Sequence, residues 1–207
     1  MLHAAETIGV DSSQAMLDRA AGVTAPGLRF VRGDIVDWSP PHPCDVVFSN
    51  AALQWVDDHE RLFARLVTFL APGGVLAVQV PANYDHPSHT IAAEVALEEP
   101  FASATGGYAR VAPVLAPESY AQLLYDLGLR DLHVRLQVYC HELQTTADLV
   151  EWTRGTLLTD YQTRMPQAMF DEYVRRYSER IDGLIGERRP YLFAFKRILM
   201  RAVAPAG

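Results

Sequence analysis

The sequence has few of the features that mark secreted or membrane proteins. It holds only two cysteines, Cys44 and Cys140, among 207 residues, too few for a disulfide framework, so a reducing compartment is expected. No apolar run approaches the roughly 18 residues of a membrane-spanning helix. The first residues also lack the basic and then apolar profile of a secretion signal. We therefore expect a soluble, cytoplasmic protein that has no membrane partner.

The sequence is also poor in positive charge. Its formal net charge is −7, and residues 1–150 hold 8 arginines and no lysine against 18 acidic residues, a net charge of −10. Binding to nucleic acid needs a basic surface, so nucleic acid is excluded as a partner. Residues 151–207 carry a net charge of +3. That charge either attracts small anions or belongs to an ordinary solvated helix surface.

What the sequence does have is a regular alternation of strand and helix patterns. Apolar runs predict strands at residues 6–10, 28–32, 45–49, 75–80, 130–141 and 191–203, and helical spacing predicts helices at 12–21, 57–71, 117–127, 146–158 and 166–183. Strands that alternate with helices predict an α/β fold with a doubly wound, mostly parallel sheet. We expect a single domain over residues 1–207, with residues 83–117 and 142–190 as cap or insertion segments.

Polar side chains follow three of the predicted strands. Asp11, Asp34 and Asn50 each come just after a strand, and ligands of such sheets bind outside the carboxyl ends of the strands. An acid at this place can accept both hydroxyls of a ribose, and a second acid can accept from an adenine amino group. Each acid alone can instead cap the helix that follows it. Their joint appearance, with Pro-Gly-Gly before a buried strand, favours the nucleotide-binding interpretation.

Four segments together resemble a known enzyme class. They read IGVDSSQAML, FVRGDIVDW, CDVVFSNAALQWVDDHERLFARLV and LAPGGVLAVQVPAN, and they are similar to consecutive motifs of the class I S-adenosylmethionine-dependent methyltransferases. The NAALQW and QVPANYDHPSH segments resemble, more narrowly, the trans-aconitate 2-methyltransferases. Further similarity in VYCHELQTTADLVEWTRGT and YLFAFKRILMRAV extends the resemblance over nearly the whole chain.

The resemblance implies S-adenosylmethionine as the cofactor and assigns a set of residues to it. Asp11 would bind the ribose, with Ser12 and Met16 beside the cofactor. Asp34 and Ile35 would hold the adenine. Asn50 and Ala51 would lie near the methionine part and its sulfonium. The acidic half of the chain is compatible with a cationic sulfonium.

The sequence departs from that class at its beginning. Members open with a strand and a glycine-rich loop, whereas this chain contains no Gly-x-Gly and starts about one strand before Asp11. We expect an N-terminally truncated fold with an apolar gap in its sheet and poor cofactor binding. One alternative is a catalytically inactive remnant or interaction module. A nicotinamide oxidoreductase is disfavoured, because it needs the missing loop and, in its short-chain type, a tyrosine four residues before the sole lysine, Lys196, where Leu192 stands.

The implied reaction is transfer of a methyl group to a small carboxylic acid such as trans-aconitate. A carboxylate is ionised at neutral pH, so catalysis needs positioning and no general base. Arginine side chains can bind the other carboxylates of such a polyacid through two hydrogen bonds each. The candidate substrate residues are Arg110, Arg154 and Arg197, with Gln54, Trp55, Tyr139, His141 and Trp152 as neighbours. For each arginine a surface ion pair is the alternative.

Other residue patterns give weaker evidence for a functional site. His86 and His89 have a metal-like spacing but no recognisable third ligand, so no metal is expected. Cys140 and His141 are neighbours on a predicted strand and should point to opposite faces, which argues against a nucleophile and base pair. The aromatic stripe of residues 170–181 fits helix packing. We expect a monomer or a weak dimer.

Overall fold

The computed structural model describes residues 4–207. The strands are β1 (Thr7–Asp11), β2 (Leu28–Arg32), β3 (Cys44–Asn50), β4 (Leu70–Pro81), β5 (Arg130–Leu143) and β6 (Tyr191–Val203). The helices are α1 (Gln14–Ala20), the 3-10 turn η1 (Leu53–Trp55), α2 (His59–Val67), α3 (Pro87–Ala96), α4 (Phe101–Thr105), α5 (Pro117–Asp126), α6 (Ala147–Arg154), α7 (Thr159–Gln162) and α8 (Gln167–Ile185). The predicted α/β class is confirmed, and within residues 4–207 no helix combines the length and apolar character needed to cross a membrane.

The strands form two separate sheets. β1 and β2 pair in parallel as a two-stranded sheet, and the other strands form a four-stranded sheet in the order β3-β4-β6-β5. β3 and β4 are parallel, whereas β6 runs antiparallel to both β4 and β5. The regular pairing of β4 begins at Val75, after an irregular stretch in which Gly73 adopts a φ of 74° that favours glycine.

One face of the four-stranded sheet is covered by α2 and α5. Their side chains Phe63 and Leu124 are fully buried, in one cluster with Val80, Ile198 and Met200 from the strands. These three strand residues are on the same face because side chains alternate along a strand. The side chain of Asp58 accepts from the backbone N–H of Arg61 at the start of α2, the cap that the predicted helix needs.

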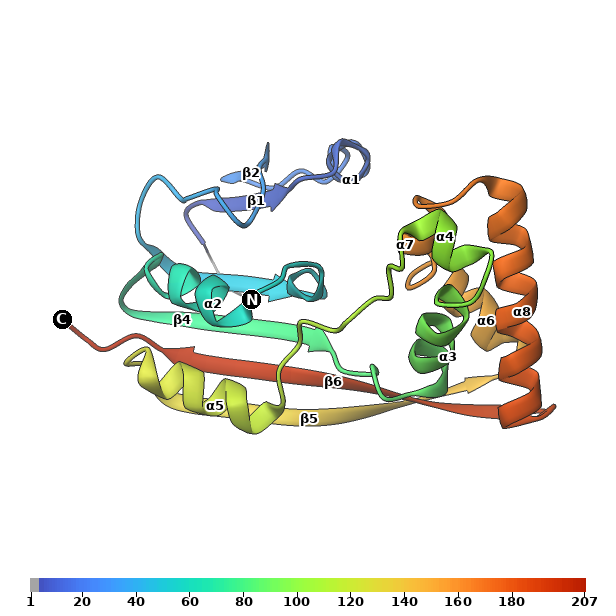
Figure 1. Ribbon diagram of the computed structural model, residues 1–207. Helices are drawn as coiled ribbons and strands as arrows, with labels where there is room; N and C mark the ends of the chain where they lie inside the picture. Colours follow the sequence, from blue (N-terminus) through green and yellow to red (C-terminus); the bar gives the residue numbers. More distant parts are fainter. Residues whose placement is uncertain (1–3) are drawn as a thin grey trace.

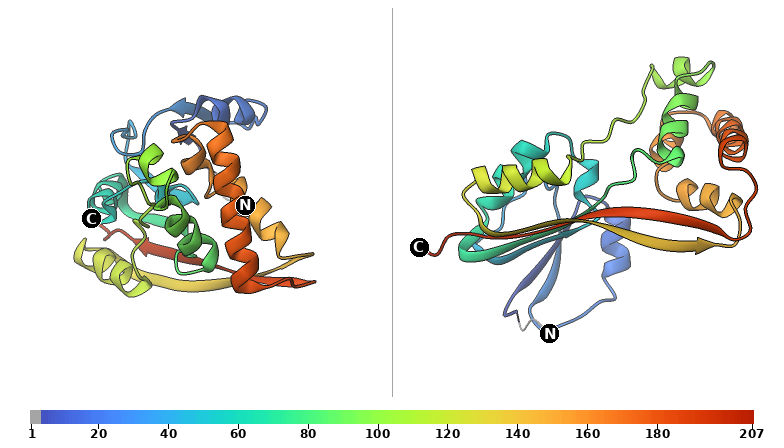
Figure 2. Two further views of the ribbon diagram at one scale, coloured as in Figure 1. Left: turned by 45° about the vertical axis from the view of Figure 1, so that its right-hand side comes forward. Right: turned by 90° about the horizontal axis from the view of Figure 1, so that it is seen from below.

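Five other helices, α3, α4, α6, α7 and α8, lie together at one end of the molecule as a cap (Figure 1). Helices α3, α4, α6, α7 and α8 lie within the two predicted cap segments, 83–117 and 142–190, and share a second hydrophobic cluster. The long strands β5 and β6 reach from the sheet into this cap (Figure 2), where the opposite face of β6 contributes Tyr191 and Phe193 to the cluster. The aromatic stripe of α8 is buried there, as helix packing requires.

Within residues 4–207, no hydrogen bond joins the β1–β2 sheet to the edge of β3. Apolar side chains on these strands are partly exposed: Val46 and Phe48 of β3 are 42% and 73% exposed, and Phe30 of β2 is 37% exposed.

Truncation of Phe63 tests the packing of α2 on the sheet. Its ring is fully buried against Tyr120 at 5.2 Å, so Phe63→Ala should destabilise the protein by about 3–5 kcal/mol in urea unfolding. Leu184, which is 65% exposed on α8, is the control, and Leu184→Ala should change stability by less than about 0.5 kcal/mol. Equal effects of the two substitutions would contradict this packing.

Candidate active site at the strand ends

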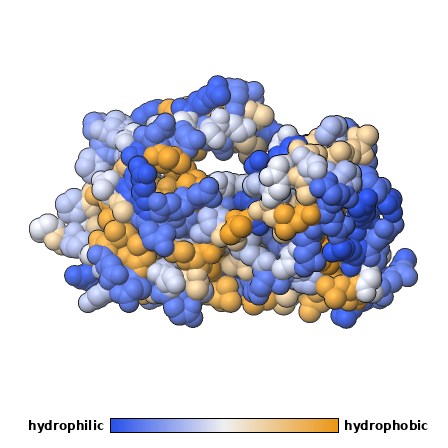
Figure 3. Space-filling view, viewed as in Figure 1, coloured by the Kyte–Doolittle hydropathy of each residue, from blue (hydrophilic) through white to orange (hydrophobic). Residues whose placement is uncertain are grey.

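The carboxyl ends of β1, β3 and β4 point toward the helical cap (Figure 1), and the molecule is hollowed between the N-terminal strands and that cap (Figure 3). Asp11 is the last residue of β1, Asp34 follows β2, and Asn50 ends β3. The predicted cofactor residues therefore follow the ends of strands. Asp11 and Asp34 are neighbours, because Gly33 donates its N–H to the carbonyl of Asp11. Within residues 4–207, no hydrogen bond joins these two acids to Asn50.

Each acid uses one carboxylate oxygen locally. Asp11 Oδ1 accepts from Ser13 N–H at 2.8 Å, and Asp34 Oδ1 accepts from Val36 N–H at 3.0 Å. Both acids thus stabilise the turn that follows, but neither is a helix cap, because Ser13 is the N-cap of α1 and the next element after Asp34 is the strand β3. In the described part of the chain, the second oxygen of each carboxylate makes no hydrogen bond within the protein. These local hydrogen bonds therefore leave half of each carboxylate available to a ligand.

The nearby residues are also suited to an adenosyl group. Met16 on α1 is 49% exposed, Ile35 is half-buried, and Ser12 is exposed in the turn between β1 and α1. Ala51, next to Asn50, has a φ of 52°, which turns the chain sharply after β3. Carboxylate acceptors beside apolar side chains are the groups that a ribose and an adenine need, so the residues present fit the adenosyl part of S-adenosylmethionine.

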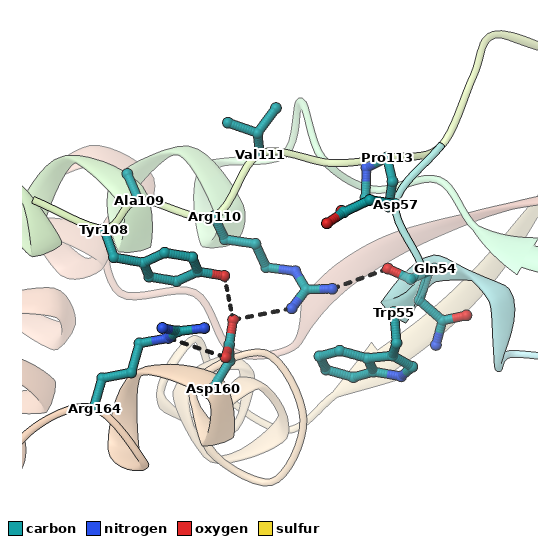
Figure 4. A pocket seen from close by; sticks show the side chains of 10 residues that line it. All are labelled: Gln54, Trp55, Asp57, Tyr108, Ala109, Arg110, Val111, Pro113, Asp160 and Arg164. Carbon is teal, nitrogen blue, oxygen red and sulfur yellow. Dashed lines mark hydrogen bonds and ion pairs between the residues drawn. The ribbon is translucent and has the colours of Figure 1, made fainter. Parts of the chain in front are cut away.

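A cavity of about 420 Å³ lies between η1 and the cap (Figure 4). Gln54 and Trp55 line it from η1, and Arg110 crosses it from the segment that leads to α5. The guanidinium of Arg110 lies over the Trp55 ring at 4.2 Å and donates to the backbone carbonyl of Gln54 at 3.0 Å. Three predicted substrate residues are thus brought together.

Asp160 compensates the positive charge in this cavity. Its Oδ2 accepts from Arg110 Nη1 at 3.1 Å and from Tyr108 OH at 2.5 Å, and Arg164 Nε lies 3.3 Å from its Oδ1. Burial opposes ionisation of Asp160, but the Tyr108 hydrogen bond and the two arginines outweigh it and hold its pKa below the usual range. With Asp57, which also lines the cavity, two acids balance the two arginines of its lining.

Three other predicted substrate residues form an aromatic group with Phe195 of β6: Tyr139 and His141 on β5, and Trp152 on α6. His141 and Trp152 have ring centroids 5.0 Å apart, and both contact Phe195 at 6.1 Å. Tyr139 is paired with Phe195 across the two strands. Arg197 lies against this group, with its guanidinium carbon 5.2 Å from the Tyr139 ring centroid and 5.1 Å from that of Phe195.

Arg197 differs from Arg110 in having no acidic partner. Within residues 4–207, no carboxylate lies within ion-pair distance of its guanidinium, whose Nη1 donates instead to Gln79 Oε1 at 2.9 Å. Its Nε is buried and has no acceptor, and the buried Nε2 of His141 has no partner either. By contrast, Arg154 pairs with Glu151 and Asp171 on the surface, as the alternative interpretation predicted.

A chain of hydrogen bonds connects the two groups. Gln54 Nε2 donates to the carbonyl of Ala51 at 2.8 Å, and Ala51 N–H donates to the carbonyl of Gln79 at 2.9 Å. Arg110 donates to Gln54 in η1, just after β3, and Arg197 donates to Gln79 on β4. Both guanidiniums are therefore hydrogen-bonded to residues near the carboxyl ends of β3 and β4. The sequence patterns did not single out Gln79.

A buried histidine supports η1. The ring of His59, on α2, bonds to the carbonyl of Leu53 at 3.0 Å and to the hydroxyl of Tyr120. Its residue exposure is 1%, and burial lowers its pKa. His59 therefore fixes the turn that carries Gln54 and Trp55.

The two histidines with metal-like spacing have structural roles. His86 caps α3 by accepting from Ser88 N–H, and it also bonds to the hydroxyl of Tyr191. His89 lies against the Tyr84 ring at 5.4 Å. Within residues 4–207, no group of three potential metal ligands is found.

Comparison with known proteins adds to this geometry. A family described as "Methyltransferase domain" matches residues 1–78. The trans-aconitate 2-methyltransferase of Deinococcus radiodurans is 42% identical, over 97% of this chain and 78% of that protein. The one from Variovorax paradoxus is 39% identical, over 96% of this chain and 77% of that protein.

The chain belongs to the trans-aconitate 2-methyltransferase family. It is therefore an S-adenosylmethionine-dependent methyltransferase with S-adenosylmethionine as its cofactor, and the resemblance read from the sequence motifs is confirmed.

Solved structures confirm the fold. The Haemonchus contortus phosphoethanolamine N-methyltransferase 2 in complex with S-adenosyl-L-methionine aligns with a TM-score of 0.52 at 19% identity, over 96% of this chain and 43% of that one. The YcgJ protein of Bacillus subtilis aligns with a TM-score of 0.54 at 15% identity, over 98% and 84%. Both support the methyltransferase-like arrangement of strands and helices.

Acid should destabilise the protein through its buried histidines. Burial lowers the pKa of His59 and His86 from 6.5, and that of His89 to about 4, where the nearby charges of His86 and Arg110 add to the effect. The unfolded chain then binds more protons than the folded one below pH 6.5, so stability falls as the pH is lowered from 6.5 toward 4.

His89→Gln tests this account. The loss of unfolding free energy between pH 7 and pH 5 should be smaller in this variant by about 1–2 kcal/mol, measured by urea unfolding at both pH values. His42→Gln is the control, because His42 is exposed, and it should leave the difference between the two pH values as in the wild type. An unchanged pH difference in His89→Gln would show that His89 is not kept neutral in the fold.

Proposed function

We propose that this protein transfers a methyl group from S-adenosylmethionine to a carboxylate oxygen of a small polycarboxylic acid, with trans-aconitate as the expected substrate. The observation that carries the proposal is Arg197, a guanidinium with a buried Nε and no acidic partner within residues 4–207. The names of the relatives from Deinococcus radiodurans and Variovorax paradoxus support the choice of acid.

A half-buried cation without a counter-charge favours an anionic ligand. Arg197 is half-buried, and shielding part of its guanidinium from water without a counter-charge is unfavourable. The contacts of Arg197 with the Tyr139 and Phe195 rings offset part of this cost, and a substrate carboxylate would offset more through a charge-assisted hydrogen bond. The unpartnered Nε2 of His141, in the same aromatic group, would offer a further contact to the substrate.

A second guanidinium suits a substrate with more than one carboxylate. Arg110 and Arg164 line the cavity together with two acids, Asp160 and Asp57, so a substrate carboxylate would bind to Arg110 through hydrogen bonds and not through a net positive charge of the lining. Arg110 is hydrogen-bonded to Gln54 of η1, and Arg197 to Gln79 of β4. Two separated guanidiniums would orient a polycarboxylate in one way, which is the main requirement for an in-line methyl transfer.

The reaction needs little acid or base chemistry from the protein. The cofactor supplies a methyl group on a positively charged sulfur, and a carboxylate with a pKa of about 4 is already ionised at neutral pH. The chain's own task is to bind, orient and shield the carboxylate. Trp55 and Trp152 would form aromatic walls near the two arginines.

We assign the cofactor to residues at the ends of β1, β2 and β3. Asp11, with Ser12 and Met16, would hold the ribose side, and Asp34 with Ile35 would hold the adenine. Asn50 and Ala51 would lie near the methionine end. The free second oxygens of the two carboxylates support this assignment.

Asp11 substitutions test the cofactor assignment. Asp11→Ala should weaken binding of S-adenosylmethionine by about 1.5–3 kcal/mol in calorimetry, because a charge-assisted contact is lost. Asp11→Asn should also weaken binding, although its amide oxygen can still accept from Ser13 N–H. Asp18→Ala on α1 is the control and should leave the affinity unchanged. Unchanged affinity in Asp11→Asn would mean that Asp11 only stabilises the turn that follows it.

Arg197→Met tests the substrate assignment. The variant should reduce kcat/KM for trans-aconitate by about 10²–10³-fold, mostly through KM, because the carboxylate loses its counter-charge. Arg201→Met is a matched control four residues along the same strand, where Arg201 pairs with Asp131 at 2.5 Å. It should retain activity within about 2-fold. Full activity of Arg197→Met on trans-aconitate would contradict the proposed substrate site.

A further inference from the structure

Gln79 is a polar side chain at a position where both neighbours along the strand are buried and apolar. It lies on β4 between Val78 and Val80, and its residue exposure is 8%. Its side chain shares a face with Arg197, because Gln79 is paired with Leu199, two residues from Arg197 on β6.

The two ends of the Gln79 amide differ in what they contact. Oε1 accepts a hydrogen bond from Arg197 Nη1 at 2.9 Å, whereas Nε2 is buried and has no acceptor in the described part of the chain. The amide cannot be turned round, because its NH₂ group would then face the NH₂ group of the guanidinium. The free group of Gln79 is therefore a donor.

The position of Gln79 places this donor beside the predicted methyl-transfer site. Gln79 is the register partner of Asn50, and its carbonyl accepts from Ala51 N–H, so it lies next to the end of β3. On its other side is Arg197, whose Nε is also a buried donor without an acceptor. Gln79 thus lies between the residues assigned to the methionine end of the cofactor and the unpaired cation.

Two adjacent free donors select the chemistry of their ligand. Leaving a buried donor unpaired costs free energy, and an apolar side chain at this position would avoid that cost. An acceptor on the ligand removes this cost, and a carboxylate suits the position because its two oxygens can accept from both donors and its charge pairs with the guanidinium.

We propose that Gln79 is a specificity-determining residue whose Nε2 donates to a carboxylate oxygen of the substrate beside Arg197. This inference rests on the proposed function, since it names a further contact in the same substrate site. The alternative is that Gln79 acts only by holding the Arg197 guanidinium in place.

The test begins with Gln79→Met, which keeps the size of the side chain and removes the donor. Steady-state rates with trans-aconitate at saturating S-adenosylmethionine should show kcat/KM reduced by about 10–100-fold, mainly through KM. Gln137→Met is the matched control: Gln137 is the register partner of Arg197 on β5, is exposed, and bonds only to a backbone carbonyl. It should remain within about 2-fold of the wild type.

A double-mutant cycle with Arg197→Met separates a direct contact from a holding role. If Gln79 donates to the substrate, Gln79→Met should lower kcat/KM by a further several-fold in the Arg197→Met background. If Gln79 only holds Arg197, it should have no effect in that background, and the proposal is overturned. The KM for S-adenosylmethionine, which also reports that each variant is folded, should stay within about 2-fold.

Three other outcomes would also overturn the proposal. A rise in the KM for S-adenosylmethionine with that for trans-aconitate unchanged would place the amide on the cofactor. If the wild type is active and Gln79→Met is equally active, Gln79 is not part of the substrate site, while the proposed function is unaffected. If the wild-type chain neither binds nor methylates any polycarboxylate, the proposed function itself fails, and the inference fails with it.

Discussion

The candidate site depends on one uncompensated charge, the guanidinium of Arg197. It lies on β6 among aromatic rings, and within residues 4–207 its only hydrogen-bonding partner is the neutral amide of Gln79. A stable fold gains little from such an arrangement, whereas Arg110, the other guanidinium of the candidate site, has Asp160 as its counter-charge. The cost is understandable if an anion completes the site when substrate binds. The aromatic rings, the free Nε and the orphaned amide donor all point to that role.

The combination of a sheet with a helical cap places the Arg197 guanidinium near the carboxyl ends of β3 and β4. β5 and β6 are long enough to pack one face against α2 and α5 and the opposite face against the cap. Arg197 lies at the crossover between the two clusters, near the carboxyl ends of β3 and β4. The cavity also lies between the sheet and the cap, because η1 lines one side of it and the cap contributes Asp160.

Much of the fold and part of the site could be predicted from the sequence. The strand and helix periods are strong in the first half, and Asp11 and Asp34 follow strands as expected. Helix α3 was not predicted, because Pro87 and the surrounding histidines resemble a loop when its packing against α8 is unknown. The helix predicted to reach Leu158 ends at Arg154, since the residues after Gly155 turn toward α7.

The substrate side was harder to predict, because it depends on pairing between distant strands. Arg197 could be proposed from the resemblance, but its lack of a partner is visible only when β4 and β6 are side by side. Gln79 could have been identified from the sequence, because it is a polar residue inside an otherwise apolar buried strand. Asp160 lies 50 residues from Arg110 in sequence, and no local pattern connects them.

A crystal structure of the protein with S-adenosylhomocysteine and the unreactive tricarboxylate tricarballylate tests the central claim most directly. The account predicts one carboxylate of tricarballylate within hydrogen-bonding distance of the Arg197 guanidinium, among the Tyr139 and Phe195 rings. Tricarballylate bound only near Arg110 and Asp160, with Arg197 still without an anion, would contradict it.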